Sequence, residues 1–219
     1  AHLASLYASF VAHACNFGLE QMAHLSDLPY DLLAWCTTWY LRDDTLKAAF
    51  TTLVNYPHAL PLSQAWGSGT LSSSDGQRFP LSGHNRHARR MPPSLGYGMG
   101  VTCYSWPSDQ LSQYGTKFVP VPVRDATYVL DELCNNETEL LIREHTTDTA
   151  GATEIIFALF DLLGFRFAPR LRDLGDRQLF ASGTLDLQPC PQLAPFLRGR
   201  INRPRILDWW DEMLRAAGS

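Results

Sequence analysis

The segment Lys117–Val123 constrains the fold of this chain more than any other stretch. Its valines and its phenylalanine favour an extended strand. Pro120 and Pro122 stand two residues apart, so the N–H groups that they lack would lie on the same side of that strand. A strand that cannot donate hydrogen bonds on one side belongs at the edge of a sheet. We therefore predict an edge strand here.

Two hydrophobic periodicities divide the rest of the chain. Apolar residues at helical spacing predict helices from Leu3 to Phe17, from Leu32 to Leu41 with Asp31 as its cap, and from Leu46 to a point before Pro57. Alternating patterns then predict further strands at Thr70–Phe79, Gly98–Trp106, Glu139–Arg143 and Arg166–Leu171. Helices are expected after Asp125, which would cap the first of them, and at Thr153–Leu163 ahead of Gly164, with Ile155 and Ile156 among its buried residues. A last helix is expected at Ile206–Ala217.

The order of these elements predicts the topology of the sheet. Short turns join the first three strands into an antiparallel meander, whereas strands that follow helices can return parallel through right-handed crossovers. With the proline strand at one edge, the first and fourth strands become neighbours. We therefore predict an α/β fold. Residues 1–66 form an all-helical segment, and residues 67–219 form a partial domain with a ribonuclease H-like mixed five-stranded sheet flanked by helices.

Two aspartates belong to the strands that this topology makes adjacent. Asp75 lies in the first strand, and Asp148 follows the fourth strand and precedes a helix. Carboxylates at the ends of neighbouring strands suit Mg²⁺ better than Zn²⁺. Ions held in this way activate an attacking oxygen and neutralise charge on the leaving oxygen of a phosphodiester. We predict Asp75 and Asp148 as catalytic metal ligands, with Mg²⁺ as the cofactor and Mn²⁺ able to replace it.

Each of these residues also has a structural interpretation. Asp75 followed by Gly76 is typical of a hairpin turn, and Asp148 could cap the next helix. His145 is expected either close to the metal site or exposed at the end of a strand. Glu212 falls on the charged face of the last helix, so we expect a solvated residue there and not a third acid. Tryptophans on the helices could stack on nucleic-acid bases, but core positions are more typical: Trp35, Trp39, Trp66, Trp209 and Trp210.

Charge and cysteine content limit the partners and the compartment. The net charge of −4 gives no overall nucleic-acid signature, so DNA binding needs a local basic patch. The loop from His84 to Pro93 is either solvated or a phosphate contact, and the candidate DNA-binding residues are Arg78, Arg86, Arg89, Arg90 and Lys117. Five cysteines without a CxxC pair argue against a zinc ribbon or a disulfide framework and favour a reduced, cytoplasmic setting. No apolar run is long enough to span a bilayer.

Eight ordered segments match one known family: Gly69–Phe79, Tyr97–Thr102, Ser108–Gln110, Val123–Asp131, His145–Gly151, Phe157–Gly164, Pro169–Asp176 and Trp210–Arg215. In these segments the chain resembles the transposases of the class II replicative transposons, the Tn3 family. The resemblance runs from about Asn16 to Ser219. It implies a DDE-type active site in which Asp75 is the first acid and Asp148 the second.

The resemblance also implies a reaction and its partners. The reaction is hydrolytic nicking of transposon-end DNA, followed by attack of the freed 3′ hydroxyl on target DNA. The expected partners are double-stranded DNA of the transposon ends and of the target, with a homodimer for the full-length protein and no membrane. The expected location is the bacterial cytoplasm, at the nucleoid. The third acid of the family, a glutamate, lies downstream of this segment, so we expect the chain to be catalytically incomplete.

The ends of the chain and two other functional classes complete these expectations. Because the chain starts at Ala1 and stops after Leu214–Ser219 without a closing element, we expect a piece of a longer protein. One alternative function is a magnesium-dependent nuclease of the same fold, with another acid from this chain completing the site. The other is a non-catalytic remnant of a transposase that binds DNA or a partner.

Overall fold

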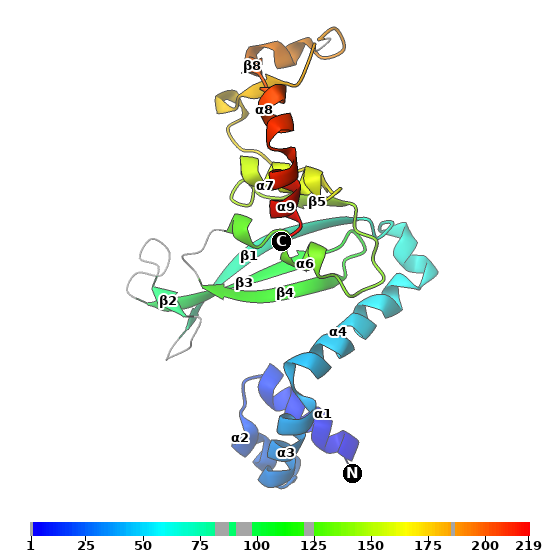
Figure 1. Cartoon of the computed structure of the whole chain (residues 1–219). Helices are drawn as coiled ribbons and strands as arrows, with labels where there is room; N and C mark the ends of the chain where they lie inside the picture. Colours follow the sequence, from blue (N-terminus) through cyan, green and yellow to red (C-terminus); the bar gives the residue numbers. More distant parts are fainter. Residues whose placement is uncertain (1, 82–87, 91–97, 121–124, 185–186) are drawn as a thin grey trace. The chain divides into compact units, whose positions relative to one another are not determined.

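The computed structural model describes residues 2–81, 88–90, 98–120, 125–184 and 187–219 (Figure 1). The chain divides into two compact units. The first consists of Ala1–Leu60 with Glu137–Glu139, and the second of Pro61–Asn136 with Leu140–Ser219. None of the helices in these described ranges is long and apolar enough to cross a membrane.

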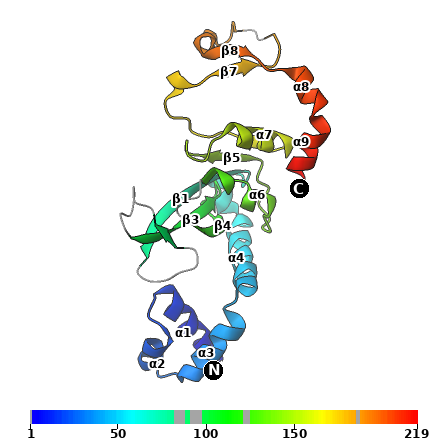
Figure 2. The same cartoon turned by 60° about the vertical axis from the view of Figure 1, so that its left-hand side comes forward.

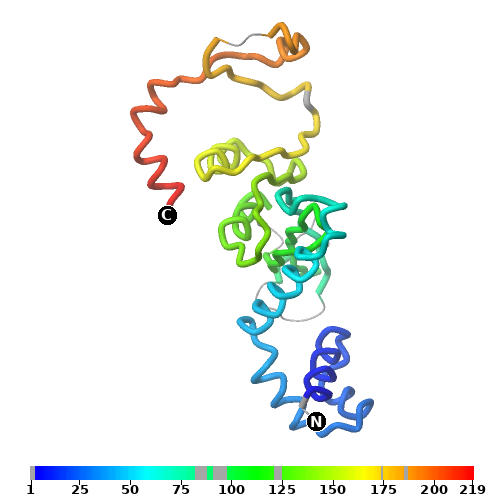
Figure 3. The backbone as a smooth tube through the Cα atoms, turned by 90° about the vertical axis from the view of Figure 1, so that its right-hand side faces the viewer, coloured from blue at the N-terminus to red at the C-terminus, as the bar shows by residue number. Residues whose placement is uncertain are grey.

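The first unit is helical, as predicted. Its elements are α1 (His2–Ala14), α2 (Leu19–Ser26), α3 (Tyr30–Tyr40) and α4 (Asp43–His58). The first three pack on one another around Ala12, Met22 and Leu33, and Figure 3 traces them in blue. Ser9 is fully buried between α1 and α3, where its hydroxyl lies 3.1 Å from the Leu33 carbonyl oxygen.

Three helix boundaries differ from the sequence predictions. The positive φ angles of Asn16 (56°) and Gly18 (77°) end α1 early and start a separate α2. Asp31 is not the cap of α3, because the helix already begins at Tyr30 and Asp31 lies in its first turn. Pro57 lies inside the last turn of α4 and does not end it. A proline so close to the end costs little, since the Ala59 N–H still bonds to the Asn55 carbonyl.

The second unit contains the predicted mixed sheet (Figure 1). Its strands are β1 (Leu71–Leu81), β2 (Arg89–Arg90), β3 (Met99–Pro107), β4 (Gln113–Pro120), β5 (Glu144–Thr147) and β6 (Arg166–Phe167). The main order is β4-β3-β1-β5-β6, with the two-residue β2 also paired to β3. β1 runs antiparallel to β3 and parallel to β5, and β6 runs parallel to β5. This α/β sheet has the predicted ribonuclease H-like order.

The proline strand is at an edge, because β4 pairs with β3 alone among the described strands. Pro120 is the last residue of β4, and Pro122 lies outside the described residues. The fourth strand is displaced from its prediction. Glu139–Arg143 is irregular, and the strand occupies Glu144–Thr147 instead. The apolar run that suggested a strand leads into the sheet, with Leu140 buried and Leu141 exposed.

Short helices precede and follow the strands of the second unit (Figure 2). They are η1 (Pro61–Ala65), η2 (Asp125–Thr127), α6 (Asp131–Cys134), α7 (Glu154–Leu162), η3 (Leu174–Asp176), η4 (Pro191–Phe196), α8 (Arg203–Asp208) and α9 (Trp210–Ala217). A two-stranded parallel sheet joins β7 (Leu179–Ala181) to β8 (Leu197–Arg200). The Thr153 hydroxyl caps α7, and Gly164, at φ 79°, follows its end as predicted. The predicted last helix is divided into α8 and α9 by non-helical backbone at Trp209.

Aromatic burial differs from the sequence prediction. The five tryptophans expected in the core are between 42% and 66% exposed: Trp35, Trp39, Trp66, Trp209 and Trp210. The buried tryptophan is Trp106 of β3, whose ring N–H donates to the Val129 carbonyl at 3.1 Å. Phe160 of α7 is also fully buried and stacks on Phe167, with ring centroids 4.4 Å apart.

Two neighbouring isoleucines on α7 provide a matched test of this packing. Ile156 is 8% exposed, whereas Ile155, which the sequence also assigned to the buried face, is 72% exposed. We expect Ile156→Ala to lower the free energy of unfolding by about 2–4 kcal/mol, because it removes buried methyl groups and leaves a cavity. Ile155→Ala should change it by about 0.5 kcal/mol or less. Urea denaturation measures both, and equal losses would contradict the orientation of α7.

Candidate active site

Strand register places Asp75 and Asp148 at matching positions of neighbouring strands. The parallel pairing of β1 with β5 runs from Leu71 opposite Glu144 to Ser74 opposite Thr147. Asp75 and Asp148 are the next residue of each strand. β1 continues antiparallel to β3 as far as Leu81, so the hairpin-turn interpretation of Asp75 is wrong. The side chains of both aspartates are exposed at this corner of the sheet.

Backbone N–H groups hold one carboxylate oxygen of each aspartate. Asp75 Oδ1 accepts the Gly76 N–H at 2.7 Å, and Asp148 Oδ1 accepts the N–H groups of Ala150 (3.0 Å) and Gly151 (3.2 Å). These bonds orient the carboxylates. Neither Oδ2 atom has a hydrogen bond to a described residue, so each can take a cation. Two exposed carboxylate oxygens fit a hard divalent ion such as Mg²⁺ or Mn²⁺.

Asp148 does not cap the helix that follows it. Thr153 does so, by accepting the Ile156 N–H at 3.2 Å, and α7 begins only at Glu154. Asp148 instead closes the tight turn at Ala150–Gly151. The N-cap interpretation of Asp148 is therefore wrong for α7.

A third carboxylate, Asp125, lies beside this pair. A Cβ atom added at Gly76 would stand 3.3 Å from Asp125 Oδ1 and 2.9 Å from Thr102 Cγ2, so Asp125 packs over the backbone next to Asp75. Partial burial raises the pKa of Asp125; the Arg78 guanidinium opposes this effect, and Asp148 and Asp75 reinforce it. The sequence predicted Asp125 as a helix cap. A cap and a site residue share the same local pattern, so only the fold distinguishes them.

Among the residues that the structure describes, no group of three or more His, Cys, Asp or Glu side chains is placed to hold a metal ion. Glu212, predicted to be solvated, is exposed and bonded to Arg215 at 2.6 Å.

A buried hydrogen-bond network links the two strands behind the aspartates. His145 of β5 is fully buried, which excludes the exposed position considered from the sequence. Its Nδ1 lies 2.7 Å from the Ser72 hydroxyl and its Nε2 lies 2.8 Å from the Ser74 hydroxyl, both on β1. Ser74 also contacts the Tyr104 hydroxyl at 2.9 Å, and the Tyr114 hydroxyl donates to Ser72 at 3.1 Å.

The bond from Tyr114 orients the protons around His145. Ser72 accepts from Tyr114, so its own proton goes to His145 Nδ1, and the proton on Nε2 is then donated to Ser74. A neutral imidazole meets both demands, whereas an imidazolium would have to donate at both nitrogens. Burial accordingly lowers the pKa of His145 from 6.5 to about 4.

The tyrosines of the network remain protonated at neutral pH. Burial raises the pKa of Tyr114 to about 12, although its bond to Ser72 opposes the rise. Burial also raises the pKa of Tyr104, and the negative charges of Asp125, Asp75 and Asp148 add to this effect. The charges of all three acids therefore reach the buried Tyr104 hydroxyl and disfavour its ionised form.

The predicted basic residues are dispersed. Arg78 is exposed on β1, and its charge acts on Asp125. Arg89 and Arg90 form β2, which pairs with Met99 and Gly100 of β3. This end of β3 is remote from Ser105, the residue that pairs with Asp75. Lys117 is engaged by Asp131 at 2.5 Å. Arg86 lies outside the described residues. Of the described four, Arg78 acts on Asp125, whereas β2 lies at the far end of β3.

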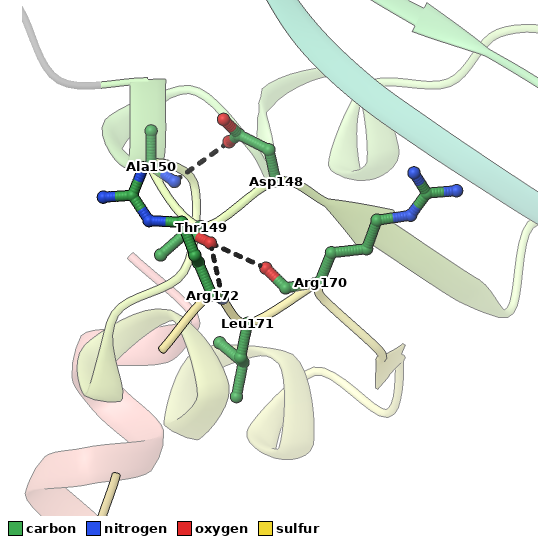
Figure 4. Close-up of a pocket in the computed structure, with 6 residues that line it drawn as sticks. All are labelled: Asp148, Thr149, Ala150, Arg170, Leu171 and Arg172. Carbon is green, nitrogen blue, oxygen red and sulfur yellow. Dashed lines mark hydrogen bonds between the residues drawn. The ribbon is translucent and has the colours of Figure 1, made fainter. Parts of the chain in front are cut away.

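An open pocket of about 550 Å³ adjoins Asp148 (Figure 4). Residues from the turn after β5 and from the segment after β6 line it: Asp148, Thr149, Ala150, Arg170, Leu171 and Arg172. The sequence analysis did not select Arg170 or Arg172. The signal that could have identified them is their position just after the strand that neighbours β5, where parallel strands present their carboxyl ends.

Comparison with known proteins identifies a family. The family model described as "Tn3 transposase DDE domain" matches residues 1–219. The chain is 43% identical to the transposase for transposon Tn501 of Pseudomonas aeruginosa over 215 residues, and 44% identical to that for transposon Tn1546 of Enterococcus faecium over 216 residues. It is 38% identical to the transposase for transposon gamma-delta of Escherichia coli (strain K12) over 220 residues. Each match covers 98% of this chain but only 22% of the relative's length. The chain thus spans about a fifth of the length of these relatives.

Two solved structures show a weaker likeness. The crystal structure of the Mos1 strand transfer complex has a TM-score of 0.35 and 13% identity, covering 91% of this chain and 69% of that one. The Mos1 mariner paired end complex with Mn has a TM-score of 0.33 and 12% identity, covering 90% of this chain and 67% of that one. Both TM-scores are below 0.5, so we draw nothing from these likenesses.

The neutral, buried His145 predicts how stability depends on pH. Its pKa is lower in the folded chain than the value of 6.5 expected after unfolding, so the unfolded chain binds more protons between pH 6.5 and 4. The stabilisation is therefore complete above pH 6.5 and is lost as the pH falls. We expect a loss of about 2 kcal/mol between pH 7 and pH 5 from this group alone.

His145→Gln is the matched control, because glutamine can donate and accept but does not titrate. This variant should be less stable than the original chain at pH 7, and its stability should fall by about 2 kcal/mol less between pH 7 and pH 5. Urea denaturation at both pH values measures the difference. The same fall in both proteins would show that His145 is not the titrating group.

Proposed function

The chain belongs to the Tn3 transposase DDE domain family, and from that premise we propose that Asp75 and Asp148 form its metal-binding catalytic pair. The observation that carries the proposal is the parallel pairing of β1 with β5, in register up to Ser74 and Thr147. This pairing brings Asp75 and Asp148, which are remote in the sequence, to the same corner of the sheet. A DDE-type enzyme needs its acids to converge in this manner.

The chemistry assigned to this corner is polynucleotidyl transfer. Bound divalent ions would activate the attacking oxygen and neutralise charge on the leaving oxygen of the phosphodiester. The chain itself supplies two carboxylates whose Oδ1 atoms accept backbone N–H groups, and their Oδ2 atoms would be the ligands of the ions. Mg²⁺ is the proposed ion, with Mn²⁺ as a substitute, because both prefer oxygen ligands.

The full-length protein would perform two steps on double-stranded DNA. The first is hydrolytic nicking at the transposon ends, and the second is attack of the freed 3′ hydroxyl on target DNA. The third acid, a glutamate, would come from sequence that follows this segment. We propose a homodimer for the full-length protein, acting in the bacterial cytoplasm at the nucleoid. The candidate DNA contacts Arg78, Arg86, Arg89, Arg90 and Lys117 remain part of this proposal.

Of the two alternatives, the non-catalytic remnant makes the opposite prediction for metal binding, which the first experiment below decides. The nuclease alternative requires a third acid from this chain. Asp125 has the right neighbours, but the described residues do not form a three-ligand group. The transposase assignment therefore has the better support.

Metal binding by the aspartate pair can be measured on this chain. We expect 10 mM Mg²⁺ or Mn²⁺ to raise the free energy of unfolding by about 1 kcal/mol if the dissociation constant is near 2 mM. Asp75→Asn and Asp148→Asn should each abolish this increment. Asp161→Asn, which removes the same charge from the exposed face of α7, should retain it. An increment that survives in both site variants would exclude the pair as ligands, and no increment in the unaltered chain would favour the non-catalytic remnant.

Catalysis should require sequence beyond this chain. We expect the isolated chain to leave transposon-end DNA uncut in the presence of Mg²⁺, whereas the full-length protein nicks it and joins the 3′ ends to target DNA. In the full-length protein, Asp75→Ala or Asp148→Ala should reduce nicking by at least 10³-fold, roughly the effect of removing a catalytic group. A gel assay with labelled end DNA measures both steps. Cutting by the isolated chain that is lost on Asp75→Ala would show that the third acid is dispensable.

A further inference from the structure

The pocket beside Asp148 joins a predicted catalytic acid to two arginines. Figure 4 shows the Arg170 and Arg172 side chains extending in opposite directions from one extended segment, with the Asp148 carboxylate between them in this view. Both arginines are exposed. Leu171 separates them in the sequence and also lines the pocket.

Hydrogen bonds fix the segment that carries these arginines against the turn that carries Asp148. The Arg170 N–H donates to the Thr147 carbonyl at 2.8 Å. The Thr149 hydroxyl donates to the Arg170 carbonyl at 3.0 Å and accepts the Arg172 N–H at 2.9 Å. Thr149 thus clamps the segment from both sides, and it is the residue next to Asp148. The backbone at Arg170 and Arg172 is consequently fixed relative to Asp148.

The charges of the two arginines are available to an anion. No described carboxylate forms an ion pair with Arg170, which is also outside the hydrogen-bond reach of Asp148. Arg172 bonds through Nε to the neighbouring Asp173 at 2.9 Å, but its side chain remains 83% exposed. A guanidinium matches the oxygens of a phosphate through paired N–H donors. Because the two side chains diverge, they fit two separate phosphates better than one.

We propose that Arg170 and Arg172 bind backbone phosphates on the two sides of the phosphodiester that reacts at Asp148, and that Thr149 is their positioning residue. This inference rests on the proposed function, because it takes Asp148 as the catalytic position. The ligand is the sugar-phosphate backbone of a DNA strand, recognised without regard to sequence. A chain with a net charge of −4 needs such a local contact to bring a polyanion to a corner that holds three carboxylates.

Salt dependence of DNA binding tests the arginines directly. The probe is a fluorescein-labelled 20-base-pair duplex, titrated with this chain in EDTA at several KCl concentrations and followed by anisotropy. Each phosphate contact contributes about 0.9 to the slope of log K against log salt concentration. Arg170→Gln and Arg172→Gln should each weaken binding about 3-fold or more and make the slope shallower by about 0.9.

Arg215→Gln is the matched control, because Arg215 is paired with a neighbouring carboxylate as Arg172 is, but does not line the pocket beside Asp148. It should leave the slope unchanged. A slope that is unaltered in Arg170→Gln and Arg172→Gln, or altered equally in Arg215→Gln, overturns the proposal. So does the absence of salt-dependent binding by the unaltered chain.

Thr149 requires a separate pair of variants. Thr149→Val keeps the shape of the side chain but removes the hydroxyl, so binding should weaken although both arginines remain. Thr149→Ser retains the hydroxyl and should bind like the unaltered chain. Circular dichroism confirms that each variant is folded before binding is compared. Equal affinity of the valine and serine variants would remove Thr149 from the proposal.

The use of EDTA separates this inference from the proposed function. Loss of binding in the arginine variants without any metal effect at Asp75 and Asp148 would support the phosphate contact and reject the metal site. A metal effect with unaltered binding in the arginine variants would support the metal site and overturn the phosphate contact.

Discussion

Parallel pairing of β1 with β5 is the interaction on which the rest of this structure depends. The two strands are far apart in the sequence and meet over four residue pairs. His145 crosses between them and contacts two serines of β1, Ser72 and Ser74. A slip of one residue would break both contacts and move Asp148 away from Asp75. A buried polar network is strongly unfavourable when only partly satisfied, so it favours a single register over its neighbours.

The same network accounts for the buried polar residues of β1 and β5. Ser72, Ser74 and His145 are buried, but every hydroxyl and ring nitrogen in the group has a partner. Phe160 covers the imidazole with a stacked ring at 5.8 Å. The imidazole is thereby kept neutral and rigid. Ser74 and His145 belong to the strands that lead to Asp75 and Asp148, so this network would support the geometry that the proposed metal site needs.

The corner itself concentrates negative charge. Beyond the effect of burial, Asp148 and Asp75 add to the raised pKa of Asp125, and the charges of all three acids add to that of Tyr104. Like charges in one place destabilise a fold unless cations or hydrogen bonds compensate them. Backbone N–H groups and Arg78 provide part of that compensation. A cation bound at the aspartates would provide more, which links metal binding to stability in the proposed function.

The sequence by itself determined the order of the strands and the identity of the edge strand, because proline chemistry and hydrophobic periodicity are local properties. It also singled out Asp75 and Asp148 through their place in those strands. It placed the fourth strand too early, because an apolar run that leads into a sheet looks the same in the sequence as a strand. It assigned Asp125 to a helix cap, because an aspartate before a helix looks the same whether it caps the helix or belongs to a site. Only the tertiary structure decided that His145 joins β1 to β5, that Asp125 packs against Gly76, and that Thr149 fixes Arg170 beside Asp148. Those contacts join residues from separate strands, and no local pattern records which distant backbone a side chain will meet.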